Sequence, residues 1–209
     1  MLPPRMSLGP IAAAALGGYA LGSVSFALLI ARARGVDLRK VGSGNLGATN
    51  AGRALGRKSG VVVYLLDALK GFGPACLAAA WSGDPALGAI AGAGAFLGHL
   101  WPAWHGFCGG KGVATLSGAL LALAPLAVVA AGVSFLAGFL LTRIASVGSL
   151  AFGLALGPAA WVLRAPQPVT IFAAGGGLAL ILTHRANIRR LLRGEEKPIG
   201  GRKTEEGQP

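Results

Sequence analysis

Charged residues are scarce in this sequence of 209 residues: they make up 12% of the chain, about half the share of an ordinary soluble domain. Acidic residues are scarcer still, with seven Asp and Glu against nineteen Lys and Arg, so the formal net charge is +12. In a soluble protein this charge would suggest nucleic-acid binding, but because 54% of the residues are hydrophobic, a membrane location explains it better. The composition indicates an integral membrane protein, whose Lys and Arg gather in cytoplasmic loops near anionic lipid.

Cysteine and histidine are also rare, which argues against metal and redox chemistry. The two cysteines, Cys76 and Cys108, have neither metal-ligand nor redox spacing, so we expect both to be packing residues. The three histidines, His99, His105 and His184, lack the spacing of zinc ligands. The sequence therefore predicts no metal site.

An uncharged apolar run covers residues 8–31, which is longer than the roughly 20 helical residues that cross a bilayer. Basic residues follow this run rather than precede it, at Arg32, Arg34, Arg39 and Lys40. That order disfavours a cleaved signal peptide, whose basic residues come first, and predicts a span with its N-terminus outside the cell.

Further apolar segments predict transmembrane helices at residues 59–80, 86–101, 147–163 and 169–183. The uncharged segment between Lys111 and Arg143 is long for one span and short for two. Because Pro125 lies near its middle, we predict two short, broken helices there.

The fold class expected from these segments is an all-α integral membrane protein, a polytopic bundle of about seven transmembrane helices. Its N-terminus would lie outside and its C-terminus in the cytoplasm, since this arrangement leaves only Arg5 and Arg164 of the 19 basic residues on the outer side. We expect a single transmembrane domain over residues 1–194 and a loose, polar cytoplasmic tail over residues 195–209.

A glycine-rich segment, residues 42–53, contains nothing that could fill a core. Its glycines let the backbone approach a ligand closely, and N–H groups exposed in this way can converge on an anion. Hydroxyl and amide side chains can also bond phosphate oxygens, and Arg53 offers a fork of donors to them. We interpret the segment as an oxyanion cradle, with these candidate ligands: Ser43, Gly44, Asn45, Gly47, Thr49, Asn50 and Arg53.

A second glycine-rich turn, Gly109-Gly110-Lys111-Gly112, precedes an apolar helix and could place the Lys111 charge against a phosphate. Neither turn matches a nucleotide-binding motif. The first satisfies G-x-G-x-x-G but follows no strand, and the second lacks the Ser or Thr that a P-loop needs after its lysine.

Two pairs of polar residues have the three-residue spacing that places them on one helical face. Asp67 and Lys70 fall inside the expected span 59–80, where charge is costly and marks either a functional group or a structural ion pair. His184 and Asn187 could form a buried, satisfied pair, or they could orient the hydroxyls of a small polar substrate. Both alternatives stay open for each pair.

Taken in order, these motifs resemble the bacterial acyl-phosphate-dependent glycerol-3-phosphate acyltransferases. The blocks that carry the resemblance are residues 42–53, 67–71, 98–115 and 184–191, with the segment around Ser146 and Ser149. Each glycine block alone is a weak signal, but their order and spacing hold over residues 22–194. The resemblance therefore covers nearly the whole chain.

The resemblance implies transfer of a fatty acyl group from acyl phosphate to the sn-1 hydroxyl of glycerol 3-phosphate, which gives 1-acylglycerol 3-phosphate and phosphate. It also implies a bacterial inner-membrane location, a cytoplasm-facing active site, and no cofactor or metal. Glycerol 3-phosphate, acyl phosphate, the lipid bilayer and the soluble enzyme that makes acyl phosphate are the expected partners, and nucleic acid is not.

Such a reaction needs cations and N–H donors more than a strong acid or base, because two phosphates must be held close together. The expected catalytic residues are Ser43, Lys111, His184 and Asn187. The expected substrate-binding residues are these four with Gly44, Asn45, Gly47, Asn50, Arg53, Lys70, Gly109, Gly110 and Ser149. His184 and His99 are candidate general bases, although a substrate phosphate oxygen could take the proton because the acyl donor is already activated.

Two other classes of membrane protein are alternatives to an acyltransferase. A transporter for an organic phosphate would also use broken helices and glycines at the midplane, but the polar motifs cluster on one side and leave few residues for a second gate. A non-enzymatic lipid-binding protein would not need two anion-type loops.

Overall fold

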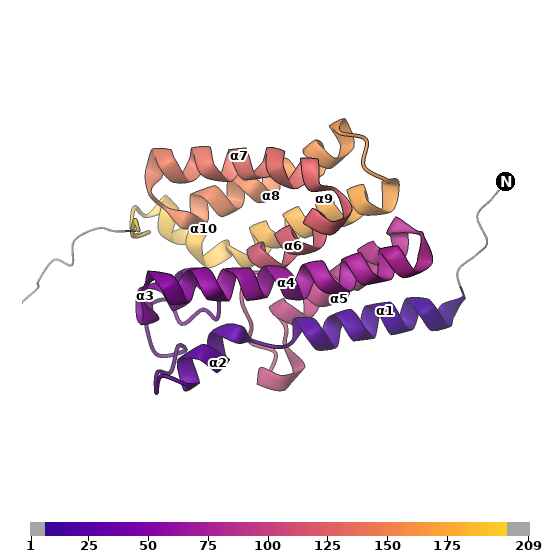
Figure 1. Cartoon of the computed structure of the whole chain (residues 1–209). Coiled ribbons are helices and arrows are strands. Elements are labelled where there is room, and N and C mark those ends of the chain that lie inside the picture. The colour runs from indigo at the N-terminus through magenta and orange to yellow at the C-terminus, as the bar shows by residue number, and fades with distance from the viewer. Residues whose placement is uncertain (1–6, 200–209) are drawn as a thin grey trace, which may run out of the picture.

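Residues 7–199 are described by a computed structural model, and within this range every regular element is a helix (Figure 1). The elements are α1 (Leu8–Gly22), α2 (Phe26–Arg32), α3 (Ala48–Leu55), α4 (Arg57–Ser82), α5 (Pro85–Leu100), the short 3₁₀ helix η1 (Ala103–His105), α6 (Val113–Leu123), α7 (Pro125–Thr142), α8 (Ala145–Val162), α9 (Gln167–Thr183) and α10 (Arg185–Leu192). The all-α prediction is confirmed for these residues. Arg5 and residues 200–209 of the predicted tail lie outside them.

Five of the described helical segments are long and apolar enough to cross a membrane, and a sixth is added if the bent pair α9 and α10 counts as one span. α6, with 11 residues, is apolar but shorter. The spans expected at residues 59–80, 86–101, 147–163 and 169–183 correspond to α4, α5, α8 and α9, each within a few residues.

The apolar run at residues 8–31 forms one candidate span, Leu8–Arg32, as predicted, but the helix within it is interrupted. It breaks between α1 and α2, and the break is stabilised by side chains that satisfy backbone groups. The Lys70 amine donates to the Val24 carbonyl oxygen at 2.7 Å, and the Ser25 hydroxyl accepts from the Leu28 N–H at 3.4 Å. Because a bilayer offers no water to a broken helix, such partners are required there.

The uncharged segment between Lys111 and Arg143 forms two helices, as predicted, and they meet at Pro125. Proline is favourable at the first position of α7, where its missing N–H has no intrahelical partner. Of the two helices only α6, with 11 residues, is short. α7 has 18 residues and qualifies as a span. The prediction of two short helices is therefore wrong for α7.

Glycines allow the helices to pack at backbone distance. A Cβ atom added at Gly22 on α1 would lie 2.1 Å from the Ala95 carbonyl oxygen on α5, and one added at Gly118 on α6 would lie 1.9 Å from the Ala68 carbonyl oxygen on α4. Close backbone packing through small residues is typical of membrane bundles, where lipid removes the hydrophobic driving force between helices.

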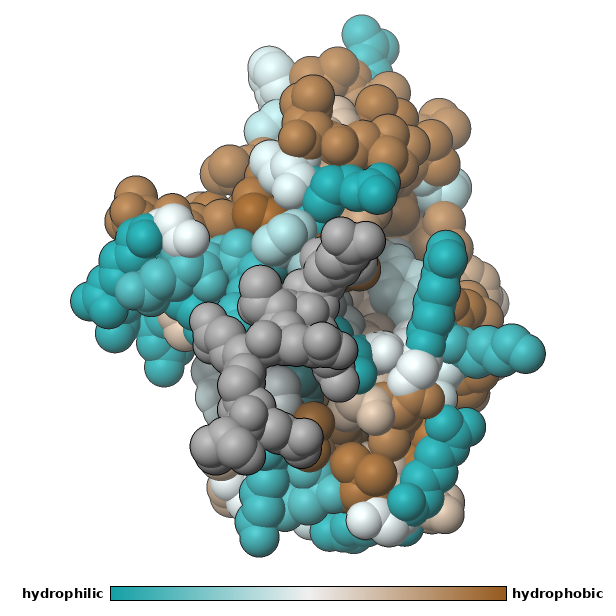
Figure 2. Space-filling model, turned by 90° about the vertical axis from the view of Figure 1, so that its left-hand side faces the viewer, coloured by the Kyte–Doolittle hydropathy of each residue, from teal (hydrophilic) through white to brown (hydrophobic). Residues whose placement is uncertain are grey.

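The polar segments gather at one end of the bundle. In Figure 1, α3 and α10 lie at the left end, whereas the N-terminal end of α1 lies at the right. Figure 2 looks at the left end and shows hydrophilic side chains gathered on it, with hydrophobic side chains above them. The two glycine-rich segments and the His184 region therefore meet at the same end of the molecule.

Candidate active site

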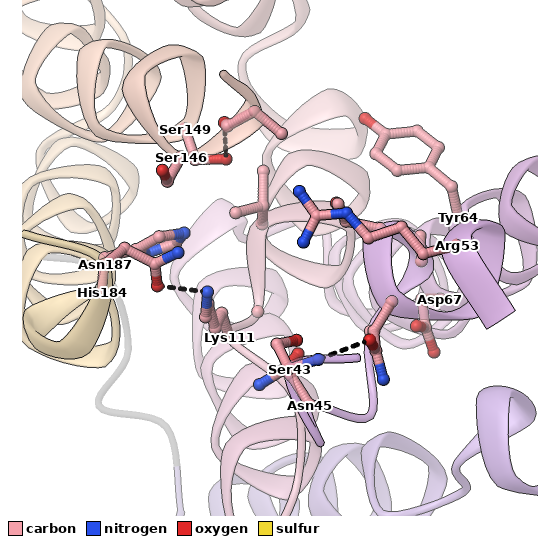
Figure 3. A pocket seen from close by; sticks show the side chains of 18 of the residues that line it. Ser43, Asn45, Arg53, Tyr64, Asp67, Lys111, Ser146, Ser149, His184 and Asn187 are labelled. Atoms are coloured by element: carbon pink, nitrogen blue, oxygen red, sulfur yellow. Dashed lines mark hydrogen bonds between the residues drawn. The ribbon is translucent and has the colours of Figure 1, made fainter. Parts of the chain in front are cut away.

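A cavity that is partly open to solvent lies at the polar end and is lined by segments that are distant in sequence (Figure 3). Most of the predicted site residues line it, namely Ser43, Asn45, Gly47, Asn50, Arg53, Lys111, Ser149, His184 and Asn187. Gly44 and Gly109 line an adjoining hollow that shares Ser43, Asn45, Lys111 and Asn187 with the cavity. Lys70 and Gly110 line neither.

Asn50, which is 2% exposed, shapes the cradle from behind. Its side-chain oxygen accepts from the Ser43 N–H at 2.9 Å, and its amide nitrogen donates to the carbonyl oxygens of Leu38 (3.2 Å) and Val41 (3.0 Å). Gly42 has a positive φ of 62°, and a Cβ there would lie 2.3 Å from the Asn50 oxygen. Both amide hydrogens of Asn50 are thus used within the loop, where the side chain stabilises the glycine-rich segment. Asn50 also lines the cavity, and its contact with substrate stays a prediction.

Arg53 is the cation that the first segment brings to the cavity. It lies in the last turn of α3, and its side chain extends from that helix into the cavity (Figure 3). Its guanidinium donates to the Lys197 carbonyl oxygen at 3.3 Å. Arg53 therefore retains further donors for an anion.

Lys111 is the cation of the second segment, and the glycines around it let the loop lie against α5. The Gly110 N–H donates to the His99 carbonyl oxygen at 3.1 Å, and a Cβ at Gly110 would lie 2.2 Å from the His99 ring. Gly110 is therefore a packing residue rather than a part of the cavity wall. The Lys111 amine donates to the side-chain oxygen of Asn187, a contact drawn in Figure 3.

Burial lowers the pKa of Lys111 to about 8, with the nearby charges of Arg190 and Arg53 acting in the same direction and Glu196 opposing them. The amine is therefore mostly charged at neutral pH, but it loses its proton at a mildly alkaline pH. A bound phosphate would favour the charged form.

His184 lies buried at the junction of α9 and α10, 2% exposed. Its Nδ1 is 2.7 Å from the Leu180 carbonyl oxygen, so Nδ1 carries the hydrogen and Nε2 is free to accept. Burial and the Lys111 charge lower the pKa of His184 to about 4. The imidazole is therefore neutral at pH 7 and is a hydrogen-bond acceptor more than a strong base.

The Asp67 and Lys70 side chains form a buried ion pair at 2.8 Å, 2% and 5% exposed. Lys70 also donates to the break between α1 and α2, as described above, and it is absent from the cavity wall. Its predicted contact with substrate is therefore not supported, and the structural alternative fits. Asp67 and His99, whose Nδ1 is 3.7 Å from an Asp67 oxygen, do line the cavity.

Ser149 lies near the start of α8, and its hydroxyl donates to the Ala145 carbonyl oxygen at 2.9 Å (Figure 3). Its lone pairs remain available at the cavity wall. Within residues 7–199, no three His, Cys, Asp or Glu residues lie close enough to hold a metal ion.

The segment after α10 contacts the rest of the protein, and the prediction of a loose tail is wrong for Glu196, Lys197 and Ile199. The Ile199 N–H donates to the Arg143 carbonyl oxygen at 2.8 Å, and Glu196 lines the cavity together with Arg190 and Ser146. Sequence reasoning missed Glu196 and Arg190 as site residues. The available signal was an acidic side chain in a strongly basic terminal region.

A family model described as glycerol-3-phosphate acyltransferase matches residues 12–194. The chain belongs to the glycerol-3-phosphate acyltransferase family. One curated member, from Anaeromyxobacter dehalogenans (strain 2CP-C), is 47% identical over 207 residues, which cover 92% of this chain and 98% of that relative. Another, from Synechococcus sp. (strain JA-3-3Ab), is 46% identical over 189 residues, which cover 90% of this chain and 92% of that relative.

Solved structures of this acyltransferase family share the fold. The crystal structure of PlsY (YgiH), an integral membrane glycerol 3-phosphate acyltransferase, in its glycerol 3-phosphate form has a TM-score of 0.88 and 41% identity, covering 92% of this chain and 96% of that one. The lysophosphatidic acid form has a TM-score of 0.86 and 40% identity. The predicted family and the integral-membrane class are therefore confirmed.

Proposed function

We propose that this protein transfers a fatty acyl group from acyl phosphate to the sn-1 hydroxyl of glycerol 3-phosphate, which yields 1-acylglycerol 3-phosphate and inorganic phosphate. The observation that carries the proposal is the convergence of Arg53 and Lys111 with Ser43, His184 and Asn187 on one cavity, in a chain of this family. The glycerol 3-phosphate and lysophosphatidic acid forms of the solved relative support the same substrate and product.

Arg53 and Lys111 offset the electrostatic repulsion between the two phosphoryl groups that this reaction brings together. At 4 Å and an effective dielectric constant of about 20, each pair of like unit charges costs about 4 kcal/mol. Arg53 and Lys111 stand on different walls of the cavity, so each can meet one phosphoryl group. The Ser43 hydroxyl and the backbone of the two glycine segments supply uncharged donors.

The hydroxyl oxygen of glycerol 3-phosphate attacks the acyl carbonyl carbon, a new ester C–O bond forms, and the bond to the phosphate oxygen breaks. His184 and Asn187 orient the attacking hydroxyl. The hydroxyl proton goes to a phosphate oxygen, because a phosphate monoester has a second pKa of about 6 and is a stronger base than an imidazole whose pKa is about 4.

The acyl chain occupies the apolar side of the cavity. Tyr64, Val113 and Phe135 line this side, and they come from α4, α6 and α7. A chain leaving the cavity between these helices would enter the surrounding lipid.

If the short helix α6 and the bent pair α9–α10 also cross the bilayer, the chain crosses seven times. With an outer N-terminus and a cytoplasmic C-terminus, the cavity then faces the cytoplasmic side of the bacterial inner membrane. The distribution of charge supports this orientation. Basic residues gather at the end of the bundle where the cavity lies, whereas Asp84 and Arg164 lie in the turns at the other end. A cytoplasmic opening would also admit the soluble enzyme that makes acyl phosphate.

The decisive experiment incubates the purified protein with labelled glycerol 3-phosphate and acyl phosphate, and in parallel with acyl-carrier-protein or acyl-coenzyme A donors. We expect labelled 1-acylglycerol 3-phosphate and stoichiometric phosphate with acyl phosphate alone. No product with any donor, combined with uptake of labelled glycerol 3-phosphate into proteoliposomes, would instead establish a transporter.

A further inference from the structure

One acidic side chain lies among the cations of the cavity. The Glu196 side chain, on the segment that follows α10, is 8% exposed and accepts three hydrogen bonds. Ser146 Oγ (2.9 Å) and Asn187 Nδ2 (2.5 Å) donate to Oε1, and Arg190 Nε (2.5 Å) donates to Oε2. A negative charge at this place weakens the attraction of the site for phosphate. Phosphate binding therefore does not explain the presence of the Glu196 carboxylate, and its hydrogen bonds to the cavity wall are the alternative.

The direction of the Asn187 amide depends on this carboxylate. An ammonium group can only donate, so Lys111 requires the oxygen side of the amide. The NH₂ side of Asn187 then faces Glu196, which as a carboxylate can only accept. The two charged groups thus fix the amide from opposite sides.

The carboxylate also remains charged at neutral pH. Burial alone would raise the pKa of Glu196, but the hydrogen bonds from Arg190, Asn187 and Ser146 and the charge of Arg190 lower it below its ordinary value. Through these partners Glu196 joins the start of α8 to α10.

We propose that Glu196 is a positioning residue for the glycerol 3-phosphate site. It holds the Asn187 amide with its oxygen toward Lys111, and it keeps the α10 wall of the cavity in place. The inference rests on the proposed function, because that function assigns Asn187 and Lys111 to the substrate. It also accounts for the ordered course of residues 195–199, whose Lys197 carbonyl oxygen accepts from Arg53.

The test is Glu196→Gln, compared with Glu195→Gln. A glutamine at 196 keeps the shape but turns one acceptor into a donor, which must then face a donor of Arg190 or Asn187. Glu195 is exposed, and its substitution removes the same charge one residue earlier. We expect Glu195→Gln to stay within about twofold of the unmodified protein, as is usual for an exposed side chain.

Steady-state kinetics separate positioning from a purely structural role. In Glu196→Gln we expect the KM for glycerol 3-phosphate to rise about tenfold, the effect of one misaligned hydrogen bond to a charged group. The KM for acyl phosphate should change less, since apolar contacts hold its chain. A lower kcat with both KM values unchanged would show only loss of folded protein and would overturn the proposal. Faster turnover of Glu196→Gln would also overturn the proposal, because it would show that residues 195–199 obstruct the cavity and inhibit the reaction.

A double-mutant cycle tests whether Glu196 acts through Asn187, and it uses equilibrium binding of labelled glycerol 3-phosphate so that inactive variants still give a result. We expect Glu196→Gln to weaken binding about tenfold alone but less than about twofold in the Asn187→Ala background. Additive effects would overturn the proposal.

If Glu196→Gln does not elute as a folded protein in size-exclusion chromatography, Ser146→Ala takes its place in the cycle, because it removes one hydrogen bond to the same oxygen and keeps the charge. The unmodified protein distinguishes the two proposals. If it neither binds glycerol 3-phosphate nor transfers an acyl group, the proposed function fails; if it does both and the cycle is additive, only the role of Glu196 fails.

Discussion

Titration of Lys111 should be visible in the affinity for glycerol 3-phosphate. Its pKa of about 8 results chiefly from burial, and only the protonated amine attracts phosphate. The charged fraction falls from about 90% at pH 7 to about 10% at pH 9, so the KM for glycerol 3-phosphate should rise about tenfold over this range. The substrate does not contribute to the change, because its second phosphate pKa is about 6 and it stays a dianion.

The matched variant is Lys111→Arg, whose guanidinium does not titrate in this range. Its activity should be lower, since a planar fork replaces a point charge, but its KM should be nearly constant from pH 7 to pH 9. The assay is the initial rate of labelled product formation at saturating acyl phosphate, corrected for hydrolysis of the donor at each pH. An equal rise of KM in the arginine variant would show that another group titrates, and a flat profile in the unmodified protein would refute the lowered pKa.

Three further predictions concern the cavity wall and the bundle. Arg53→Ala should lower kcat/KM about ten- to a hundredfold, the loss of a charge-assisted phosphate contact, while the protein still inserts into membranes; near-normal turnover would remove Arg53 from the phosphate site. Gly22→Ala should destabilise the protein by about 1–3 kcal/mol through overpacking, measured by thermal unfolding in detergent, whereas Gly17→Ala on the same helix, where a Cβ meets nothing within 4 Å, should be neutral or stabilising. Lys70→Met should cost about 3–5 kcal/mol because it leaves the Asp67 charge buried without the lysine that pairs with it at 2.8 Å, and adding Asp67→Asn should recover part of that loss; no recovery would contradict the ion-pair role.

The helices and the two anion-type segments could be predicted because their signals are local. A run such as residues 125–142 is apolar over a length sufficient to span a bilayer, whatever packs against it. A segment such as residues 42–53 is rich in glycine and small polar side chains, which predicted a surface that faces a ligand. The prediction that it fills no core is wrong for Leu46 and Ala51, which are buried in a hydrophobic cluster, and residues 48–53 belong to α3 rather than to a loop. The break at Val24 was not predictable in this way, because the group that stabilises it, Lys70, lies 46 residues later in the chain.

The roles of single polar side chains depended on neighbours that the sequence does not name. Asn50 and Asn45 lie in the same motif, yet only the tertiary structure shows that the Asn50 amide is used by Leu38 and Val41. Glu196 carried no motif, and its importance depends on the approach of Ser146, 50 residues away.

Hydropathy, glycine content and charge act over a few residues, so a helical membrane protein with two cationic glycine segments could be identified from the order of the amino acids. Which polar groups face the cavity, and which stabilise its walls, became evident only from the packing of the helices. A buried donor or acceptor must find a partner, and that partner comes from distant helices rather than from the residues on either side.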